Sequence, residues 1–259
     1  MPDSMPVIFF GHGNPMNAIQ SNGWTEGWRA IGESIPKPRA ILMISAHWYI
    51  EDTAVTAGDE PRTIHDFGGF PKELYQCQYP APGDRALAAR VQQLLAPTPV
   101  RLADDWGLDH GTWSVLYHAY PDADVPVVQL SIDATLSPAA HYELAELLTP
   151  LREEGILIAG SGNVVHNLHA YGWGRHVPEP YEWASAFERR ARDLLLTGDH
   201  TPLIEYETLG RDAAMSIPTP EHYLPLLYVL AQRQDGEPVT FPVEGVDGGS
   251  VSMLTVRIG

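Results

Sequence analysis

Apolar residues along this chain gather into short continuous runs, and amphipathic segments separate the runs. Four runs bounded by Gly, Pro or polar residues predict buried strands over residues 6–10, 40–48, 125–133 and 155–163. Apolar residues at helical spacing predict helices over residues 24–31, 84–95, 138–153, 181–196 and 220–232. Residues 239–258 are expected to form paired strands. This alternation predicts an α/β fold with a central, mostly parallel sheet flanked by helices on both faces.

The composition is that of a folded enzyme. Of the 259 residues, 44% are hydrophobic and 19% are charged, which is typical of a globular protein with a sizeable core. No internal repeat or low-complexity tract divides the chain, so we expect one catalytic domain over residues 1–259.

Charge and cysteine content exclude several classes of partner. The formal net charge of -17 disfavours binding to nucleic acid or to an anionic membrane surface. No stretch approaches the roughly 20 apolar residues of a membrane span, and no basic region precedes the first apolar run. We therefore expect a cytoplasmic protein, either a monomer or a dimer. The single cysteine, Cys77, can form no intramolecular disulfide and is expected to be a lone buried thiol.

Three histidines stand at the ends of predicted strands. His12 follows the first strand with only Gly11 between them, His47 closes the second, and His166 follows the fourth. Ligands of open α/β sheets collect beyond the carboxyl ends of the strands, so these histidines point to one site. Each alone is equally well explained as a hydrogen-bonded turn or strand-end histidine.

A fourth histidine, His222, is expected in the first turn of a helix. Thr219 is a plausible N-cap and Pro220 a plausible first helical residue. The helix dipole at that position favours a neutral, ligating imidazole. The neighbouring Glu221 is alternatively a first-turn charge that complements the dipole.

Two further histidines are candidate pocket residues: His65, in a Gly-rich aromatic loop, and His110, just before a predicted helix. The other five are interpreted as surface residues: His118, His141, His169, His176 and His200. Gly160-Ser161-Gly162 lacks the Lys-Ser/Thr of a phosphate-binding P-loop, and no short H-E-x-x-H spacing occurs. A set of imidazoles would suit Zn, Fe, Cu or Ni.

At these positions the chain resembles the DOPA-type extradiol ring-opening dioxygenases of the class III extradiol superfamily. The resemblance rests on ordered blocks from about residue 5 to the C-terminus: GHGNPM, SAHW, TIHDFGGFP, YPAPG, LDHGTWSVL, VPVVQLSID, SGNVVHNL, PTPEHYLPLLYVL and GSVSML. It implies a single α/β domain that uses O₂ to open the ring of a catechol, such as DOPA, to a semialdehyde.

The resemblance also implies site roles. His12 and His47 match metal ligands, and His222 matches the third ligand. More distant relatives use a glutamate there, so Glu221 is an alternative to His222. His166 matches a residue that is a ligand or an acid/base. Fe(II) is implied for turnover, with Zn²⁺ plausible as the bound ion.

Other pocket roles are expected from general chemistry. Either His166 or His110 would carry the phenolic proton, because a neutral imidazole suits that task. Aromatic side chains would exclude water: Trp48, Phe67, Phe70 and Trp113. Arg62 or Arg211 could hold a substrate carboxylate, although each also fits a surface position.

Two rival functions remain open at this stage. A zinc hydrolase or amidase would use three histidines to activate water, with Glu221 as the general base. A non-enzymatic metal-binding protein could use the same fold.

Overall fold

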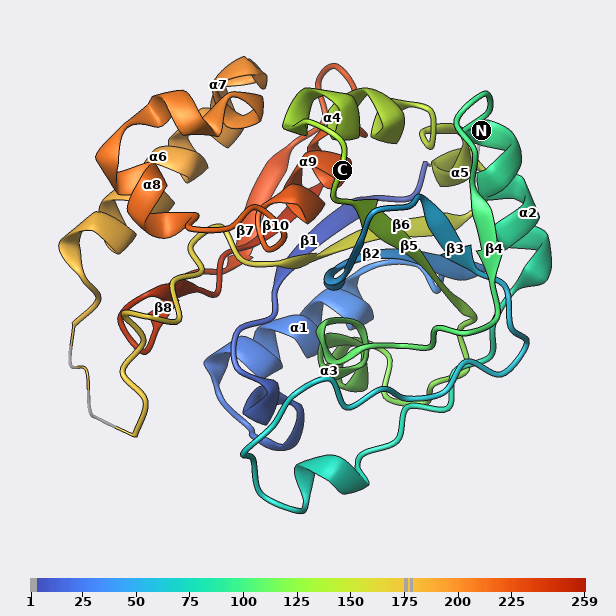
Figure 1. Cartoon of the computed structure of the whole chain (residues 1–259), viewed down its shortest axis with the longest axis horizontal. Helices are drawn as coiled ribbons and strands as arrows, with labels where there is room; N and C mark the ends of the chain where they lie inside the picture. The colour runs from blue at the N-terminus through green and yellow to red at the C-terminus, as the bar shows by residue number, and fades with distance from the viewer. Residues whose placement is uncertain (1–3, 175–176, 178) are drawn as a thin grey trace.

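An eight-stranded sheet runs through the computed structural model of the chain, which describes residues 4–174, 177 and 179–259 (Figure 1). The strands lie in the order β4-β3-β5-β2-β6-β1-β10-β7. Their bounds are β1 (Val7–Gly11), β2 (Ala40–Ile50), β3 (Ala54–Thr56), β4 (Arg101–Ala103), β5 (Val127–Asp133), β6 (Ile156–Gly162), β7 (Val239–Val243) and β10 (Thr255–Ile258). A separate pair is formed by β8 (Val246–Asp247) and β9 (Val251–Ser252).

The centre of the sheet is parallel and its margins are mixed. Strands β5, β2, β6 and β1 are parallel neighbours. On one side β3 pairs with β5 in the antiparallel sense, and on the other β10 pairs antiparallel with both β1 and β7. The carboxyl ends of the four central strands therefore share one edge.

Helices cover both faces of this sheet, as Figure 1 shows for α1 and α3 on one side and α4 and α9 on the other. The first layer contains α1 (Gly23–Ser34), α3 (His110–Ala119), η1 (Pro15–Ile19) and η2 (Leu74–Gln76). The second contains α2 (Arg85–Leu94), α4 (Pro138–Glu146), α5 (Pro150–Glu153), α6 (Glu182–Thr197), α7 (Thr201–Ile204), η3 (Tyr206–Leu209), α8 (Arg211–Ser216) and α9 (Leu224–Leu230).

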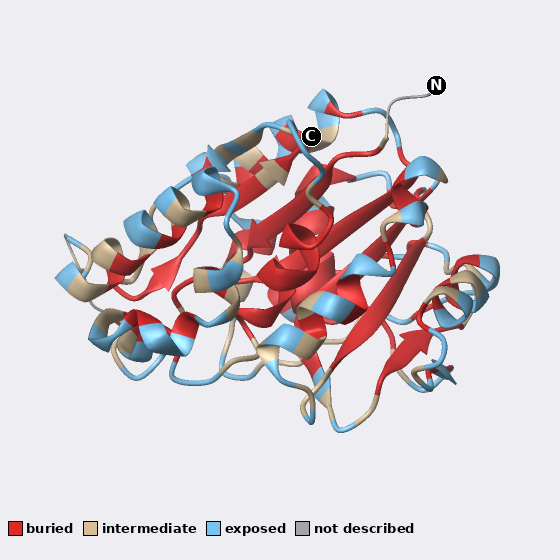
Figure 2. Cartoon of the chain, turned by 90° about the horizontal axis from the view of Figure 1, so that it is seen from above, coloured by how far each residue is buried: buried red, intermediate tan, exposed pale blue. Residues whose placement is uncertain are grey.

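Side-chain alternation along the strands fills two cores, one on each face. In β1, Val7 and Phe9 belong to the core beneath α9, whereas Ile8 and Phe10 belong to the core beneath α1 and α3. The central strands are buried along most of their length, and the more exposed positions lie at the carboxyl ends of β2 and β5 (Figure 2). Burial on both faces explains why these strands are continuous apolar runs in the sequence. The predicted fold class is confirmed.

The predicted helix over residues 138–153 is wrong in one respect, because it is two helices. Pro150 lacks an N–H, and its ring would clash with the carbonyl of the residue four positions earlier in a continuous helix. That residue is Glu146, where α4 ends, and Pro150 instead begins α5.

The expected helix start at Thr219 is also wrong. Residues 221–223 form a turn, and α9 begins only at Leu224. Pro225 has no N–H to bond to the carbonyl of Glu221, so a regular helix cannot extend through this turn. The Thr219 hydroxyl donates to Glu221 Oε1 (2.8 Å) instead of capping a helix. His222 therefore projects from a turn.

Two histidines predicted at the surface are buried. His118 lies with Nε2 2.8 Å from the carbonyl oxygen of Asn17, and His141 has Nδ1 2.9 Å from Tyr228 Oη. A hydrogen bond offsets much of the free-energy cost of burying a neutral imidazole. The polar residues around His118 and His141 along the chain did not indicate this burial. His169 is exposed as predicted, His200 is half-buried, and His176 lies outside the described residues.

Within the described residues, no helix has both the length and the apolarity to cross a bilayer.

The buried His141 makes stability depend on pH. Burial lowers its pKa from 6.5 to about 4, with a partial offset from the charge of Asp133. As the pH falls, the unfolded chain binds a proton at His141 before the folded chain does. The contribution of His141 to stability is therefore complete above pH 6.5 and is lost as the pH falls towards 4. We expect the loss to reach up to about 3 kcal/mol.

Urea unfolding between pH 7.5 and 4.5 tests this expectation. His141→Gln should flatten the dependence of the unfolding free energy on pH, whereas His169→Gln, at an exposed histidine, should not. Equal slopes in the wild type and His141→Gln would contradict the assignment.

Candidate active site

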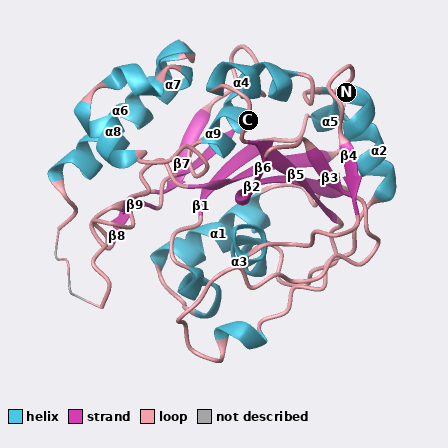
Figure 3. Ribbon diagram, in the orientation of Figure 1, coloured by secondary structure: helices cyan, strands magenta, loops and turns pink. Residues whose placement is uncertain are grey.

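The parallel register brings the strand-end histidines together. Gly11 at the end of β1 lies opposite Gly162 of β6, and Ser45 of β2 lies opposite Ser161. His12 continues this pairing, because its N–H donates to the Gly162 carbonyl (3.1 Å). Beyond these strand ends the chain continues into loops, drawn in pink in Figure 3, and His12, Asp66 and His166 lie in such non-helical, non-strand segments.

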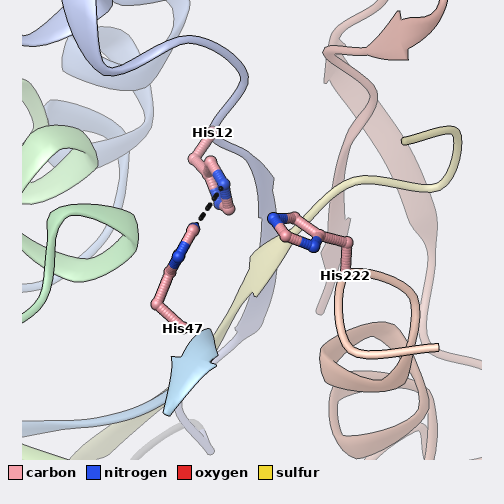
Figure 4. Close-up of side chains that lie close together, drawn as sticks. All are labelled: His12, His47 and His222. Carbon is pink, nitrogen blue, oxygen red and sulfur yellow. Dashed lines mark hydrogen bonds between the residues drawn. The ribbon is translucent and has the colours of Figure 1, made fainter. Parts of the chain in front are cut away.

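His12, His47 and His222 point towards one another from three separate elements (Figure 4). The Nε2 atoms of His12 and His47 are 3.2 Å apart, and this contact is the dashed line in Figure 4. The His222 ring centroid lies 5.4 Å from that of His12 and 5.1 Å from that of His47. Each of the three offers a ring nitrogen within 4.8 Å of the others, which is the spacing of ligands around one metal ion.

Hydrogen bonding behind the rings shows that this cluster fits a cation. Ser161 Oγ gives its one proton to the carbonyl of Gly111 (2.5 Å), so it accepts from Nδ1 of His12 (3.0 Å). Nδ1 of His47 faces a carboxylate oxygen of Asp66 (3.2 Å), which can only accept. Both rings therefore carry their proton on Nδ1 and direct bare Nε2 lone pairs at each other. Such a contact is favourable only when a proton or a metal ion lies between the two nitrogens, and the raised pKa of His47 favours a proton there when no metal is bound.

The electrostatics of the two rings differ. Burial and the neighbouring His47 hold the pKa of His12 well below 6.5. Burial also acts to lower the pKa of His47, but the contact with Asp66 and the charges of Asp109 and Glu221 outweigh it and raise that pKa. The carboxylates thus collect behind His47, where they would offset the charge of a bound metal.

His166 lies against His222 and outside the three-histidine cluster. The two rings are stacked, with centroids 3.4 Å apart and planes 8° from parallel. Burial, together with His47 and His110, lowers the pKa of His166 to about 3, so the ring is neutral at physiological pH. Glu221 Oε1 is 3.2 Å from Nδ1 of His222, on the side of that ring away from a bare Nε2.

His110 joins the site, together with a residue that sequence reasoning missed. His110 is the first residue of α3 and stacks obliquely on His47, with centroids 3.9 Å apart. Its Nδ1 is 3.0 Å from Asp66 Oδ2. Proximity to His110 and His47 holds the pKa of Asp66 far below its usual range, against the effect of burial. The signal for Asp66 was its place directly after His65 in the block TIHDFGGFP.

His65 does not join the cluster. Its Nε2 is 3.0 Å from the carbonyl oxygen of Cys77, and its ring packs against Trp113 with centroids 5.6 Å apart. Trp113 is fully buried, and Trp48 stacks on Trp106 instead of facing the site. His65 and Trp113 therefore support the loop that carries Phe67.

The pocket itself has a volume of about 210 Å³. Six of its lining residues are the histidines and the aspartate already described, and the others include Asn14, Phe67, Phe70, Leu168, Tyr171 and Trp173. Phe67 and Phe70 were expected there, whereas Tyr171 and Trp173 were not. Within the described part of the chain, no Lys or Arg lines the pocket, and the expected Arg62 and Arg211 lie elsewhere. The aromatic side chains of the walls suit the ring of an aromatic substrate.

A family comparison decides the class of protein. Residues 6–243 match the model described as the catalytic LigB subunit of aromatic ring-opening dioxygenase. The chain belongs to this family. It is a metal-dependent, extradiol ring-cleaving dioxygenase, and the sequence resemblance is confirmed.

Relatives of this LigB-family enzyme match over nearly their full length. A 4,5-DOPA dioxygenase extradiol from Escherichia coli (strain K12) is 50% identical, covering 98% of this chain and 95% of the relative. One from Beta vulgaris is 39% identical, covering 95% and 93%. The crystal structure of an uncharacterized protein from Escherichia coli K12 superposes with a TM-score of 0.87 at 46% identity, covering 98% and 100%.

A buried polar layer supports the histidines of this LigB-family site from below. Asp109 is fully buried and caps α3, accepting from the N–H of Thr112 (3.1 Å). Its carboxylate also accepts from Ser45 Oγ (2.6 Å) and Gln129 Nε2 (2.7 Å). This network ties the start of α3 to β2 and β5, so it fixes His110 relative to His47.

Gly111 leaves the space that this layer needs. A Cβ atom there would lie 2.6 Å from Ser45 Oγ and 2.8 Å from His47 Cδ2. We expect Gly111→Ala to lower the unfolding free energy by about 1–3 kcal/mol through overpacking, and to weaken zinc binding by displacing His47.

Calorimetric zinc titration and urea unfolding measure both effects. Gly58→Ala is the matched control, because a Cβ there meets nothing within 4 Å. Alanine is otherwise the better helix former, so a more stable Gly111→Ala protein with unchanged zinc affinity would contradict the expected crowding.

Proposed function

We propose that this chain acts as one catalytic domain that cleaves a single-ring catechol of the DOPA type, inserting both atoms of O₂ to give a ring-opened semialdehyde. The observation that supports this most is the converging His12, His47 and His222 cluster at the base of a small aromatic-walled pocket. The names of the two DOPA dioxygenase relatives support the substrate.

We also propose cytoplasmic action, since the lone thiol Cys77 is free and buried.

We propose His12, His47 and His222 as the residues that hold the metal, with Fe(II) for turnover and Zn²⁺ as an ion that the same nitrogens would accept. Glu221 then acts behind His222 as the carboxylate that orients a ligating imidazole, and not as a ligand. When bound, the metal would acidify a coordinated catechol and bring it together with O₂.

The protein's own groups supply the remaining functions. His110 and His166 flank the ligand cluster as neutral imidazoles, since burial lowers the pKa of both, and each can accept a phenolic proton at a ring nitrogen. Phe67, Phe70 and Trp173 line the pocket and would exclude water from the reacting ring.

The two rival functions find less support. A hydrolase would need Glu221 in the pocket as a base, but Glu221 contacts His222 and is not among the pocket-lining residues in the described chain. Membership of a dioxygenase family speaks against a non-enzymatic metal-binding role.

Oxygen uptake tests the proposed reaction. After anaerobic reconstitution with Fe(II), addition of DOPA and air should consume one O₂ per DOPA and produce a yellow chromophore. Zinc-loaded protein is the control and should consume none. Iron-loaded protein that takes up no oxygen with any catechol, or that acts equally well without oxygen, would sink the proposal.

Metal content of single variants tests the division of roles. His222→Ala should lose its metal. His166→Ala should keep it and lose turnover by about 10²-fold or more, as expected for a proton carrier. Glu221→Gln should retain metal with reduced affinity. Loss of metal from His166→Ala would make that residue a ligand, and equal losses in Glu221→Gln and His222→Ala would favour the carboxylate.

A further inference from the structure

The carboxylate of Asp66 contacts two functional histidines at once. Its Oδ1 accepts the backbone N–H of His110 (2.8 Å). Its Oδ2 lies 3.2 Å from Nδ1 of His47 and 3.0 Å from Nδ1 of His110. Asp66 Oδ2 and His110 Nδ1 are buried and make no hydrogen bond elsewhere in the described chain, and the two imidazole nitrogens are the polar groups that face this oxygen.

Proton positions follow from the chemistry of a carboxylate. An ionised carboxylate only accepts hydrogen bonds, so each facing nitrogen must carry the proton for the contact to be attractive. His47 and His110 are then both protonated on Nδ1 and keep their lone pairs on Nε2. In His47 that is the nitrogen which meets His12. In His110 it is the nitrogen left for the pocket.

The segment that carries Asp66 is held firmly in place. Ile64 N–H donates to the carbonyl of Leu108 (2.7 Å), and Trp113 Nε1 donates to the carbonyl of Ile64 (2.8 Å). His65, whose ring nitrogen meets the Cys77 carbonyl, fixes the other side. Asp66 is therefore placed by its backbone, and the carboxylate can orient the histidines instead of following them.

We propose that Asp66 is a shared positioning residue, which holds the metal ligand His47 and the proton carrier His110 in the same Nδ1–H tautomer. This inference rests on the proposed function for the roles of the two histidines. One carboxylate thereby links metal binding to proton transfer.

Asp66→Asn separates this role from a structural one. If the amide oxygen keeps the bond to the His110 N–H, the amide nitrogen faces two protonated Nδ1 atoms, and at least one ring must move its proton to Nε2. We expect zinc affinity to fall by about 10–100-fold. For iron-loaded enzyme at saturating metal, kcat should fall by about tenfold or more while KM changes by less than about threefold.

The matched control is Asp122→Asn, the same charge change at an exposed position. It should leave zinc affinity and kcat unchanged. In a His110→Gln background, Asp66→Asn should still weaken zinc binding but lower kcat little further, because the imidazole that Asp66 orients for proton transfer is already gone. Folded Asp66→Asn protein with zinc affinity within threefold of wild type overturns the proposal, and an undiminished further loss of kcat in His110→Gln overturns the link to His110.

A measurement on the wild type avoids any folding defect of the variant. Imidazole ¹⁵N chemical shifts of the zinc-loaded protein should show protonated Nδ1 in both His47 and His110, with His→Gln variants giving the assignments. An Nε2–H tautomer in either ring overturns the proposal. Neither this experiment nor the zinc titration uses oxygen, so absence of ring cleavage would refute the proposed function without deciding the tautomers.

Discussion

Parallel pairing of β1 and β2 with the same strand, β6, is the constraint on which the site depends. The register places Gly11 against Gly162 and Ser45 against Ser161. As a result, His12 and His47 approach within 3.2 Å although 35 positions separate them along the chain. A slip of one residue would turn each side chain to the opposite face of the sheet. The apolar cores on both faces prevent that slip, so the energy that holds the fold together also sets the spacing of the site.

The second requirement is local neutrality. Several imidazoles gathered in a buried space cannot all be protonated, and burial keeps His12, His166 and His222 in the neutral form. The negative groups, Asp66 and Glu221, stand behind the rings and leave the centre to nitrogen lone pairs. Facing nitrogen lone pairs repel one another in an empty pocket and attract a bound cation. An arrangement that lowers stability in this way is typical of a functional site.

Much of this could be predicted from the sequence. The central strands were recognisable because both of their faces are buried, and three histidines could be placed because strand ends converge at one edge of a parallel sheet. The approach of His222 required the family resemblance, since nothing local shows which part of the sheet a turn contacts. The role of Asp66 could not be predicted, because it arises from two partners, His47 and His110, that are distant from it in sequence. The buried His141 was misread for the same reason.

The glycines of β6 have a consequence for how this site could change. A Cβ at Gly160 would lie 2.6 Å from the carbonyl oxygen of Pro225, and one at Gly162 would lie 2.1 Å from that of His222. Asn163 N–H donates to the same His222 carbonyl (2.8 Å). The turn that carries His222 therefore contacts β6 through its main chain. These contacts do not depend on which side chain stands at position 222. During divergence, an imidazole at this position could be exchanged for a carboxylate without repacking the sheet, which separates inheritance of the scaffold from inheritance of metal preference.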